Sequence, residues 1–195
     1  MYTHLINSNK KIFIINGKGG SGKDTFVENV NKYVPTDNYS SIESIKQVAE
    51  LLGWDGGKSD KDRKFLSDLK KLSSDYNDMP YTDILHYISY FLTSMYNEDE
   101  LLFIHIREPK EIEKVRSFYE NNGVYIKTIY IHNNRLINKT YHNDADDNVV
   151  NYKYDYYVDN SGSIDDLDKE VREFIKSFEI RPFIRVDEEE VDDED

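Results

Sequence analysis

The chain has 195 residues, 38% of them hydrophobic, a formal net charge of −13 at pH 7 and no cysteine. This length suits one domain with a single sizeable core, and no apolar run approaches the roughly 18 residues that a membrane-spanning helix needs. The lack of cysteine excludes disulfides, thiolate metal sites and cysteine nucleophiles. The amino terminus lacks the features of a secretory signal, so we expect a cytoplasmic protein with no membrane partner.

The predicted elements alternate along the chain between apolar runs typical of buried strands and segments with helical periodicity. In chain order they are a strand at 11–16, a helix from 24 that ends before 35, helices at 44–52, 65–76 and 84–95, a strand at 101–106, a helix from 109 that stops at 122, strands at 124–131 and 154–158, and a helix at 163–178. This alternation predicts an α/β fold of three layers. A mostly parallel sheet of about five strands is expected to carry helices on both faces.

The end of the chain is strongly acidic. Residues 187–195 read DEEEVDDED, with eight acidic groups and no basic one. Like charges at this density repel and bury little apolar surface, so we predict a domain over 1–180 followed by a disordered acidic tail over 181–195. The tail is interpreted as an aid to solubility or a contact for a basic partner. Neither tail nor body offers a basic face for a duplex, so we expect no nucleic-acid partner.

The segment 17–23, Gly-Lys-Gly-Gly-Ser-Gly-Lys, fits the phosphate-binding pattern G-x-x-x-x-G-K and lies between a predicted strand and a predicted helix. Its glycines permit positive φ and let backbone N–H groups converge on phosphate oxygens, and the helix adds its positive dipole end. Lys23 is expected to reach the β and γ phosphates. The sequence therefore predicts a P-loop NTPase fold, with an ATP site formed by Lys18, Gly19, Gly20, Ser21, Gly22, Lys23, Asp24 and Thr25.

One position departs from the standard motif. The residue after the lysine is normally Ser or Thr and ligates Mg²⁺, but here it is Asp24, with Thr25 next. A carboxylate is also a hard oxygen ligand, so Asp24 and Thr25 are predicted to bind the metal; Asp24 could instead act through water or orient the acceptor phosphate. The strand at 101–106 runs into His105-Ile-Arg107-Glu108, with no aspartate at its tip. Asp24 is therefore expected to carry more of the metal binding than usual.

The string Ser21-Gly-Lys-Asp-Thr25 resembles the P-loop of bacteriophage deoxynucleoside monophosphate kinases, and the stretch 18–24 resembles that of animal-type phosphomevalonate kinase. Both belong to the nucleoside monophosphate kinase-like group of P-loop proteins. The segment 154–162 is similar to that group's last strand and Asn-containing turn, so the resemblance extends from about residue 10 to residue 178. It implies that 1–180 is a kinase domain that uses ATP and Mg²⁺ and phosphorylates a small phosphorylated acceptor.

In this family, arginines outside the P-loop neutralise the transferring phosphoryl group, because positioning and positive charge supply most of the catalysis. The resemblance assigns this role to Arg107 and Arg135, which would act with Lys23 and Asp24 as catalytic residues. Both arginines follow predicted strands, and ligands of open α/β sheets bind at the carboxyl ends of strands.

The acceptor is expected to contact Lys18, Arg63 and Arg107. Arg63 lies in a basic cluster at the start of a predicted helix and could equally belong to a solvated face. The polar, Asn-rich segment 135–152 suits either a mobile lid or a plain long connection.

Three functions remain open on these grounds. The leading hypothesis is transfer of the ATP γ-phosphoryl group to a (deoxy)nucleoside monophosphate. A kinase of another phosphorylated metabolite, such as phosphomevalonate, is an alternative within enzymes. A nucleotide-binding switch whose acidic tail engages a partner is an alternative of a different class. A homodimer is compatible with the sequence, which does not reveal the oligomeric state.

Overall fold

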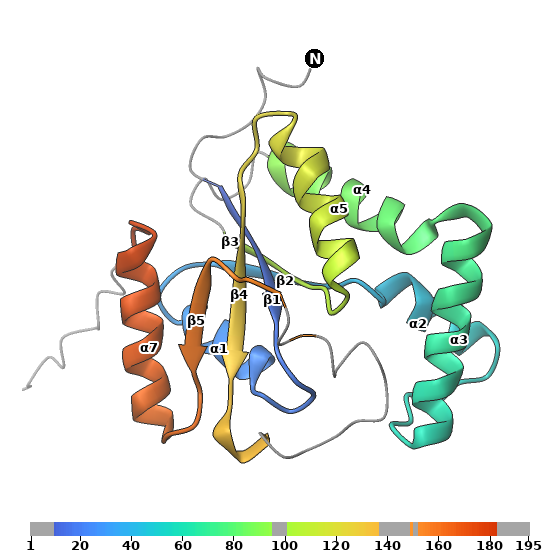
Figure 1. Cartoon of the computed structure of the whole chain (residues 1–195), viewed down its shortest axis with the longest axis horizontal. Coiled ribbons are helices and arrows are strands. Elements are labelled where there is room, and N and C mark those ends of the chain that lie inside the picture. Colours follow the sequence, from blue (N-terminus) through green and yellow to red (C-terminus); the bar gives the residue numbers. More distant parts are fainter. Residues whose placement is uncertain (1–9, 95–100, 137–148, 150–151, 183–195) are drawn as a thin grey trace, which may run out of the picture.

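The computed structural model describes residues 10–94, 101–136, 149 and 152–182. Its centre is one five-stranded sheet with the order β2-β3-β1-β4-β5, in which every neighbouring pair is parallel (Figure 1). The strands are β1 (Lys11–Asn16), β2 (Thr36–Ser40), β3 (Leu101–His105), β4 (Ile126–His132) and β5 (Tyr156–Asp159). The predicted α/β fold with a parallel sheet of about five strands is thereby confirmed.

In the part of the chain that the structure describes, six helices and one 3-10 turn lie between or after the strands. They are α1 (Lys23–Val30), α2 (Glu43–Leu51), α3 (Asp60–Asn77), α4 (Met79–Thr93), α5 (Pro109–Glu120), η1 (Asn134–Leu136) and α7 (Ile164–Ser177). A capping box of Ser163 and Asp166, in which each side chain accepts a hydrogen bond from the other's backbone N–H, begins α7, the helix predicted at 163–178. In the described part of the chain, no helix has the length and hydropathy needed to cross a bilayer.

Strand β2 was not among the strands predicted by residue range, because its sequence, TDNYS, is mostly polar. It lies at the edge of the sheet and pairs with β3 alone. Its polar side chains find partners from distant segments: the Asp37 carboxylate accepts from the Tyr87 hydroxyl at 2.9 Å, and the Asn38 oxygen lies 2.7 Å from His105 Nε2. These contacts, rather than an apolar pattern, make this segment compatible with a strand.

The apolar core forms two layers, one on each face of the sheet. Alternate residues of β1 point to opposite faces, and all of its residues from 12 to 16 are buried, which explains its continuous apolar run. Helices α4 and α5 cover one face with Ile84, Ile88, Ile112 and Val115. Helices α1 and α7 cover the other face with Phe26, Val27, Val171 and Phe174 (Figure 1).

The parallel arrangement brings the carboxyl ends of the strands to one edge of the sheet, the lower edge in Figure 1. The glycine-rich loop follows β1 there, and η1 follows β4. The predicted acidic tail (181–195) lies outside the described residues except for 181 and 182. The segment 135–152, interpreted as either a lid or a plain connection, is described only at 135, 136, 149 and 152.

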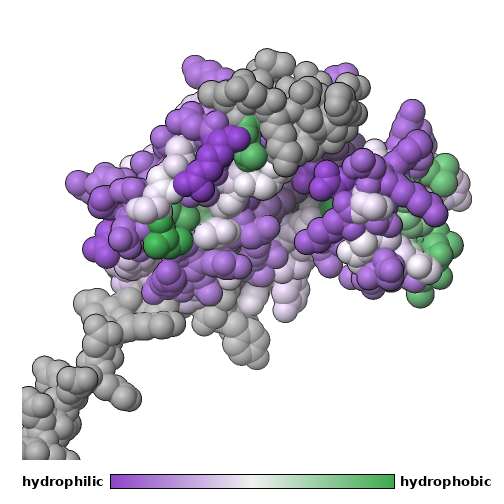
Figure 2. All heavy atoms as spheres, turned by 90° about the horizontal axis from the view of Figure 1, so that it is seen from below, coloured by the Kyte–Doolittle hydropathy of each residue, from purple (hydrophilic) through white to green (hydrophobic). Residues whose placement is uncertain are grey.

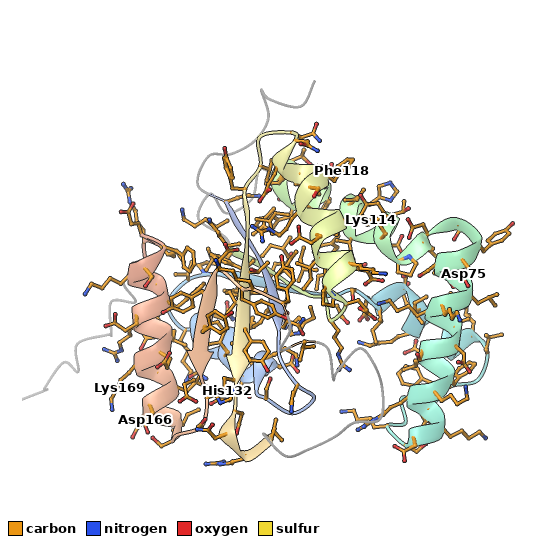
Figure 3. The ribbon with its side chains drawn as sticks, in the orientation of Figure 1. Asp75, Lys114, Phe118, His132, Asp166 and Lys169 are labelled. Atoms are coloured by element: carbon orange, nitrogen blue, oxygen red, sulfur yellow. The ribbon has the colours of Figure 1, made fainter. Side chains whose placement is uncertain are left out.

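Replacing Phe174 by Ala should destabilise the fold strongly. The Phe174 ring is fully buried and packs against the rings of Phe13 and Phe26, with centroid distances of 5.0 and 5.4 Å. The resulting cavity is expected to lower the free energy of unfolding by about 3–5 kcal/mol, measured by urea denaturation. The matched control is Phe118→Ala on the outer side of α5 (Figure 3), where the side chain is 44% exposed and we expect a change within about 1 kcal/mol. Equal losses in the two variants would contradict this assignment of the core.

Candidate functional site

The loop between β1 and α1 owes its shape to glycine. Gly17, Gly20 and Gly22 have φ values of 151°, 82° and 90°, in the region that disfavours other residues. A Cβ on Gly17 would lie 2.6 Å from the carbonyl oxygen of Ile131, and a Cβ on Gly22 would collide with the side-chain amide of Asn160. The loop is therefore pressed against β4 and the end of β5, which leaves no room for side chains.

Lys23 begins α1 and its side chain turns back over this loop. Its Nζ donates hydrogen bonds to the carbonyl oxygens of Gly17 at 2.7 Å and Lys18 at 3.1 Å. The loop is closed by a hydrogen bond from the Ser21 N–H to the Lys18 carbonyl oxygen at 3.0 Å. An ammonium group is thus held at the amino end of a helix, where anionic phosphate groups bind favourably.

Two asparagines at the carboxyl ends of strands brace the loop: Asn16 is the last residue of β1, and Asn160 follows β5. The Asn160 side-chain amide donates to the Ser21 carbonyl oxygen at 2.8 Å, and its backbone N–H donates to the carbonyl oxygen of His132, at the lower end of β4 in Figure 3. The Asn16 side-chain oxygen accepts from the Gly17 N–H at 2.8 Å, and its amide donates to the Arg107 carbonyl oxygen at 3.0 Å. No motif in the sequence assigns a role to Asn16; the available signal is a polar residue at the end of an otherwise apolar strand.

Beside the start of α1, Asp24 faces the tip of β3. His105 Nε2 lies 3.6 Å from Asp24 Oδ1 and 2.7 Å from the side-chain oxygen of Asn38. Burial lowers the pKa of His105 to about 4; the negative charge of Asp24 opposes this shift, whereas the positive charges of Lys23 and Arg107 add to it. The imidazole is therefore neutral at pH 7. The Asp24 side chain is 80% exposed and open to a ligand.

A buried ion-pair cluster fixes the segment around Arg107. Lys70 of α3 is mostly buried and donates hydrogen bonds to Glu108 at 2.8 Å and to Glu111 at 2.9 Å. Burial alone would raise the pKa of Glu108, but the Lys70 ammonium outweighs it and holds that pKa below its usual value. Burial and the charge of Glu108 raise the pKa of Glu111. Helix α3 is thereby tied to the start of α5, next to Arg107.

The structure brings several predicted site residues to the same edge of the sheet. Lys18 donates from Nζ to the Leu136 carbonyl oxygen at 3.2 Å, which joins the loop to η1, the turn that contains Arg135. The backbone of Arg107 meets the loop through Asn16. Figure 2 looks at this edge, where the coloured surface is mostly hydrophilic.

The two other predicted site residues, Thr25 and Arg63, lie on the first turns of α1 and α3. Thr25 is exposed on the first turn of α1, one residue after Asp24. Arg63 is exposed on the first turn of α3, which a capping box of Ser59 and Asp62 begins. Within the described ranges, Arg63 takes no part in the contacts that join the loop, β3 and η1.

Solved structures share this architecture. No protein-family model and no curated protein sequence matches the chain. The tunicamycin resistance protein of Deinococcus radiodurans aligns with a TM-score of 0.53 at 13% identity, covering 90% of this chain and 99% of its own. The APS kinase CysC of Mycobacterium tuberculosis, in complex with AMPPNP and APS, aligns with a TM-score of 0.50 at 13% identity, covering 88% and 98%. These likenesses establish the fold alone and confirm the predicted α/β fold class.

Replacing Asn160 by Ala should weaken nucleotide binding. The substitution removes the donor to the Ser21 carbonyl oxygen and leaves the loop without its brace to β5. One net hydrogen bond is worth about 0.5–1.5 kcal/mol, so the Kd for ATP should rise about two- to tenfold in isothermal titration calorimetry. The matched control is Asn122→Ala, where the amide donates to the Phe118 carbonyl oxygen on α5 and no effect on ATP binding is expected. An unchanged Kd in the Asn160 variant would contradict the bracing role.

Replacing Lys70 by Met should destabilise the protein in a pH-dependent way. Glu108 and Glu111 would be left together without their cation, which should lower the free energy of unfolding by about 2 kcal/mol. The loss is not larger because both carboxylates keep part of their hydration. Loss of the ammonium raises the pKa of both carboxyl groups in the folded state, so the folded variant binds more protons as the pH falls. The difference in free energy of unfolding between the variant and the unaltered chain should therefore shrink from pH 7 towards about pH 5. Urea unfolding at several pH values measures this.

The control is Lys64→Met on the same helix, whose ion pair with Asp68 is exposed on both sides. It should change little at any of these pH values. A Lys70 variant as stable as this control would show that the cluster does not hold α3 to α5.

Proposed function

We propose that the chain is an ATP- and Mg²⁺-dependent phosphotransferase that transfers the γ-phosphoryl group to a small phosphorylated acceptor. The observation that carries this proposal is the geometry of Lys23, whose ammonium lies over a glycine-rich loop between a buried strand and a helix. This is the setting in which G-x-x-x-x-G-K binds nucleotide phosphates. The fold likeness to an APS kinase solved with AMPPNP and APS supports the same class of reaction.

The residues of the site suit the chemistry of phosphoryl transfer, which depends on positioning and charge more than on covalent catalysis. Backbone N–H groups of the loop and Lys23 would hold the β and γ phosphates. Arg107 and Arg135 follow β3 and β4 at the edge where ligands of such sheets bind, and would neutralise charge on the transferring group.

The metal is assigned to the start of α1. The exposed Asp24 carboxylate offers the hard oxygen that Mg²⁺ prefers, and the Thr25 hydroxyl is the neighbouring oxygen donor, so the donor set fits this ion. Mg²⁺ held there would supply positive charge that neutralises the nucleotide phosphates.

A (deoxy)nucleoside monophosphate is our leading acceptor, on the resemblance of residues 21–25 to the phage kinases. Lys18, Arg63 and Arg107 would contact it. The alternative, a kinase of a metabolite such as phosphomevalonate, is favoured by the resemblance of residues 18–24. A nucleotide-binding switch is the alternative outside enzymes, because β3 ends in His105 rather than in an acid.

The test is a coupled ADP-release assay across deoxynucleoside and ribonucleoside monophosphates and phosphomevalonate. We expect one acceptor class to raise turnover well above the rate with water alone. Lys23→Ala should lower kcat/KM by about 100-fold or more, because it removes a charge that stabilises the transition state. Lys176→Ala, an exposed lysine on α7, is the matched control and should leave the rate unchanged. If ATP binds but no acceptor stimulates ADP release, the kinase proposal is contradicted and the nucleotide-binding switch is favoured.

A further inference from the structure

Helix α3 lies at the outside of the molecule, at the right edge in Figure 1, and packs on α2 and α4. It is 18 residues long, and among the α-helices that the structure describes it is the only one without a buried side chain. Its apolar residues Phe65, Leu66 and Leu69 are only half-buried. Much of the apolar surface of this helix therefore remains in contact with solvent.

Exposed apolar side chains are concentrated on α3 and at the end of α2. Leu72 and Tyr76 of α3 are 65% and 85% exposed, and Leu51 and Leu52 are 87% and 65% exposed. These three leucines are all the exposed leucines of the described residues. Figure 2 shows apolar side chains gathered on the right side of the molecule, over α2 and α3. A concentration of this kind is typical of a surface that another protein covers.

The apolar residues of α3 have the spacing of a helix–helix contact. Successive members of the set are four, three and four residues apart, which places them in one stripe along the helix: Phe65, Leu69, Leu72 and Tyr76. The spacing is the same when read from either end. A second copy of α3 that runs antiparallel therefore brings Phe65 opposite Tyr76 and Leu69 opposite Leu72. The stripe is complementary to itself, as a two-fold symmetric dimer requires.

The charged residues beside the stripe fit the same antiparallel arrangement. Lys64 and Asp75, which Figure 3 labels on the upper half of α3, are both exposed and three turns apart, so they lie on the same side of the helix. In the antiparallel pair Lys64 comes opposite residue 77 of the second copy, about 3 Å along the axis from Asp75. In a parallel pair each lysine would face a lysine and each aspartate an aspartate. The charges therefore favour the antiparallel pair.

We propose that the protein forms a two-fold symmetric homodimer in which α3 of one copy packs antiparallel on α3 of the other, and that Leu51 and Leu52 extend this contact. The inference goes beyond the proposed function and does not depend on it. A different side of α3 carries Lys70, which is bound to Glu108 and Glu111 at the start of α5. The dimer contact thus holds from outside the same helix that this ion-pair cluster holds from inside.

The oligomeric state of the full chain tests the dimer. Sedimentation velocity over a wide range of protein concentration should give twice the mass of one chain, 23.0 kDa, at the upper end. Leu72→Glu places a charge in the stripe and should raise the Kd of the dimer by about 100-fold or more, with an unchanged far-ultraviolet circular dichroism spectrum. The matched control, Phe118→Glu on the outer side of α5, should leave the Kd unchanged. A monomer at all concentrations, or a dimer that Leu72→Glu does not weaken, would overturn the proposal.

A charge exchange tests the antiparallel packing and leaves the apolar stripe intact. Lys64→Glu should raise the Kd of the dimer about tenfold, because it turns two attractions per dimer into repulsions. Adding Asp75→Lys restores opposite charges and should recover most of this loss. A double variant as weak as the single one would contradict the antiparallel packing and with it the proposal. These measurements need no nucleotide, so a missing dimer leaves the proposed kinase function untouched, and a missing kinase activity leaves the dimer untouched.

Discussion

Asn16 joins three separate segments of the chain at the carboxyl end of the central strand. Its side chain is fully buried; it accepts from Gly17 and donates to the Arg107 backbone and to the Tyr154 hydroxyl at 2.8 Å. Tyr154 in turn donates to the Val149 carbonyl oxygen at 2.9 Å. An amide suits this place because it carries both an acceptor and two donors, and a buried polar group left without partners is costly. The geometry of the loop, the end of β3 and the approach to β5 all depend on this group.

The charged groups around this point fall into two kinds. Lys70 is mostly buried and pairs with the partly buried carboxylates of Glu108 and Glu111, which holds α3 against the start of α5. Lys23 and Asp24 lie at the start of α1, where the amino end of the helix favours an anion. The first set, around Lys70, fixes helices beside this edge of the sheet. The second set, Lys23 and Asp24, is placed to bind a ligand at the same edge. The structural charges and the ligand-binding charges are separate groups, because buried charges must be paired whereas a binding site must leave charge accessible.

Polar contacts over long sequence distances also shape the edge of the sheet. Asn38 and Asp37 of β2 pair with His105 and Tyr87, which are 67 and 50 residues away. The five residues of this segment do not by themselves indicate these partners, which lie far along the chain. The local sequence at 36–40 therefore does not indicate a strand, whereas the apolar sequence of β1 does, because its alternate residues are buried on both faces.

Local chemistry was sufficient to predict much of this protein: six helices from their periodicity and end signals, four strands from apolar runs, and a phosphate-binding loop from glycine and lysine spacing. These features depend on residues that are near neighbours in the chain. Tertiary structure alone decided that Asn16 joins the loop to Arg107 and that Asn160 braces the loop. It also decided that β2 completes the sheet and that His105 faces Asp24. Those contacts join segments tens of residues apart, and only the parallel packing of the strands brings their ends to one edge.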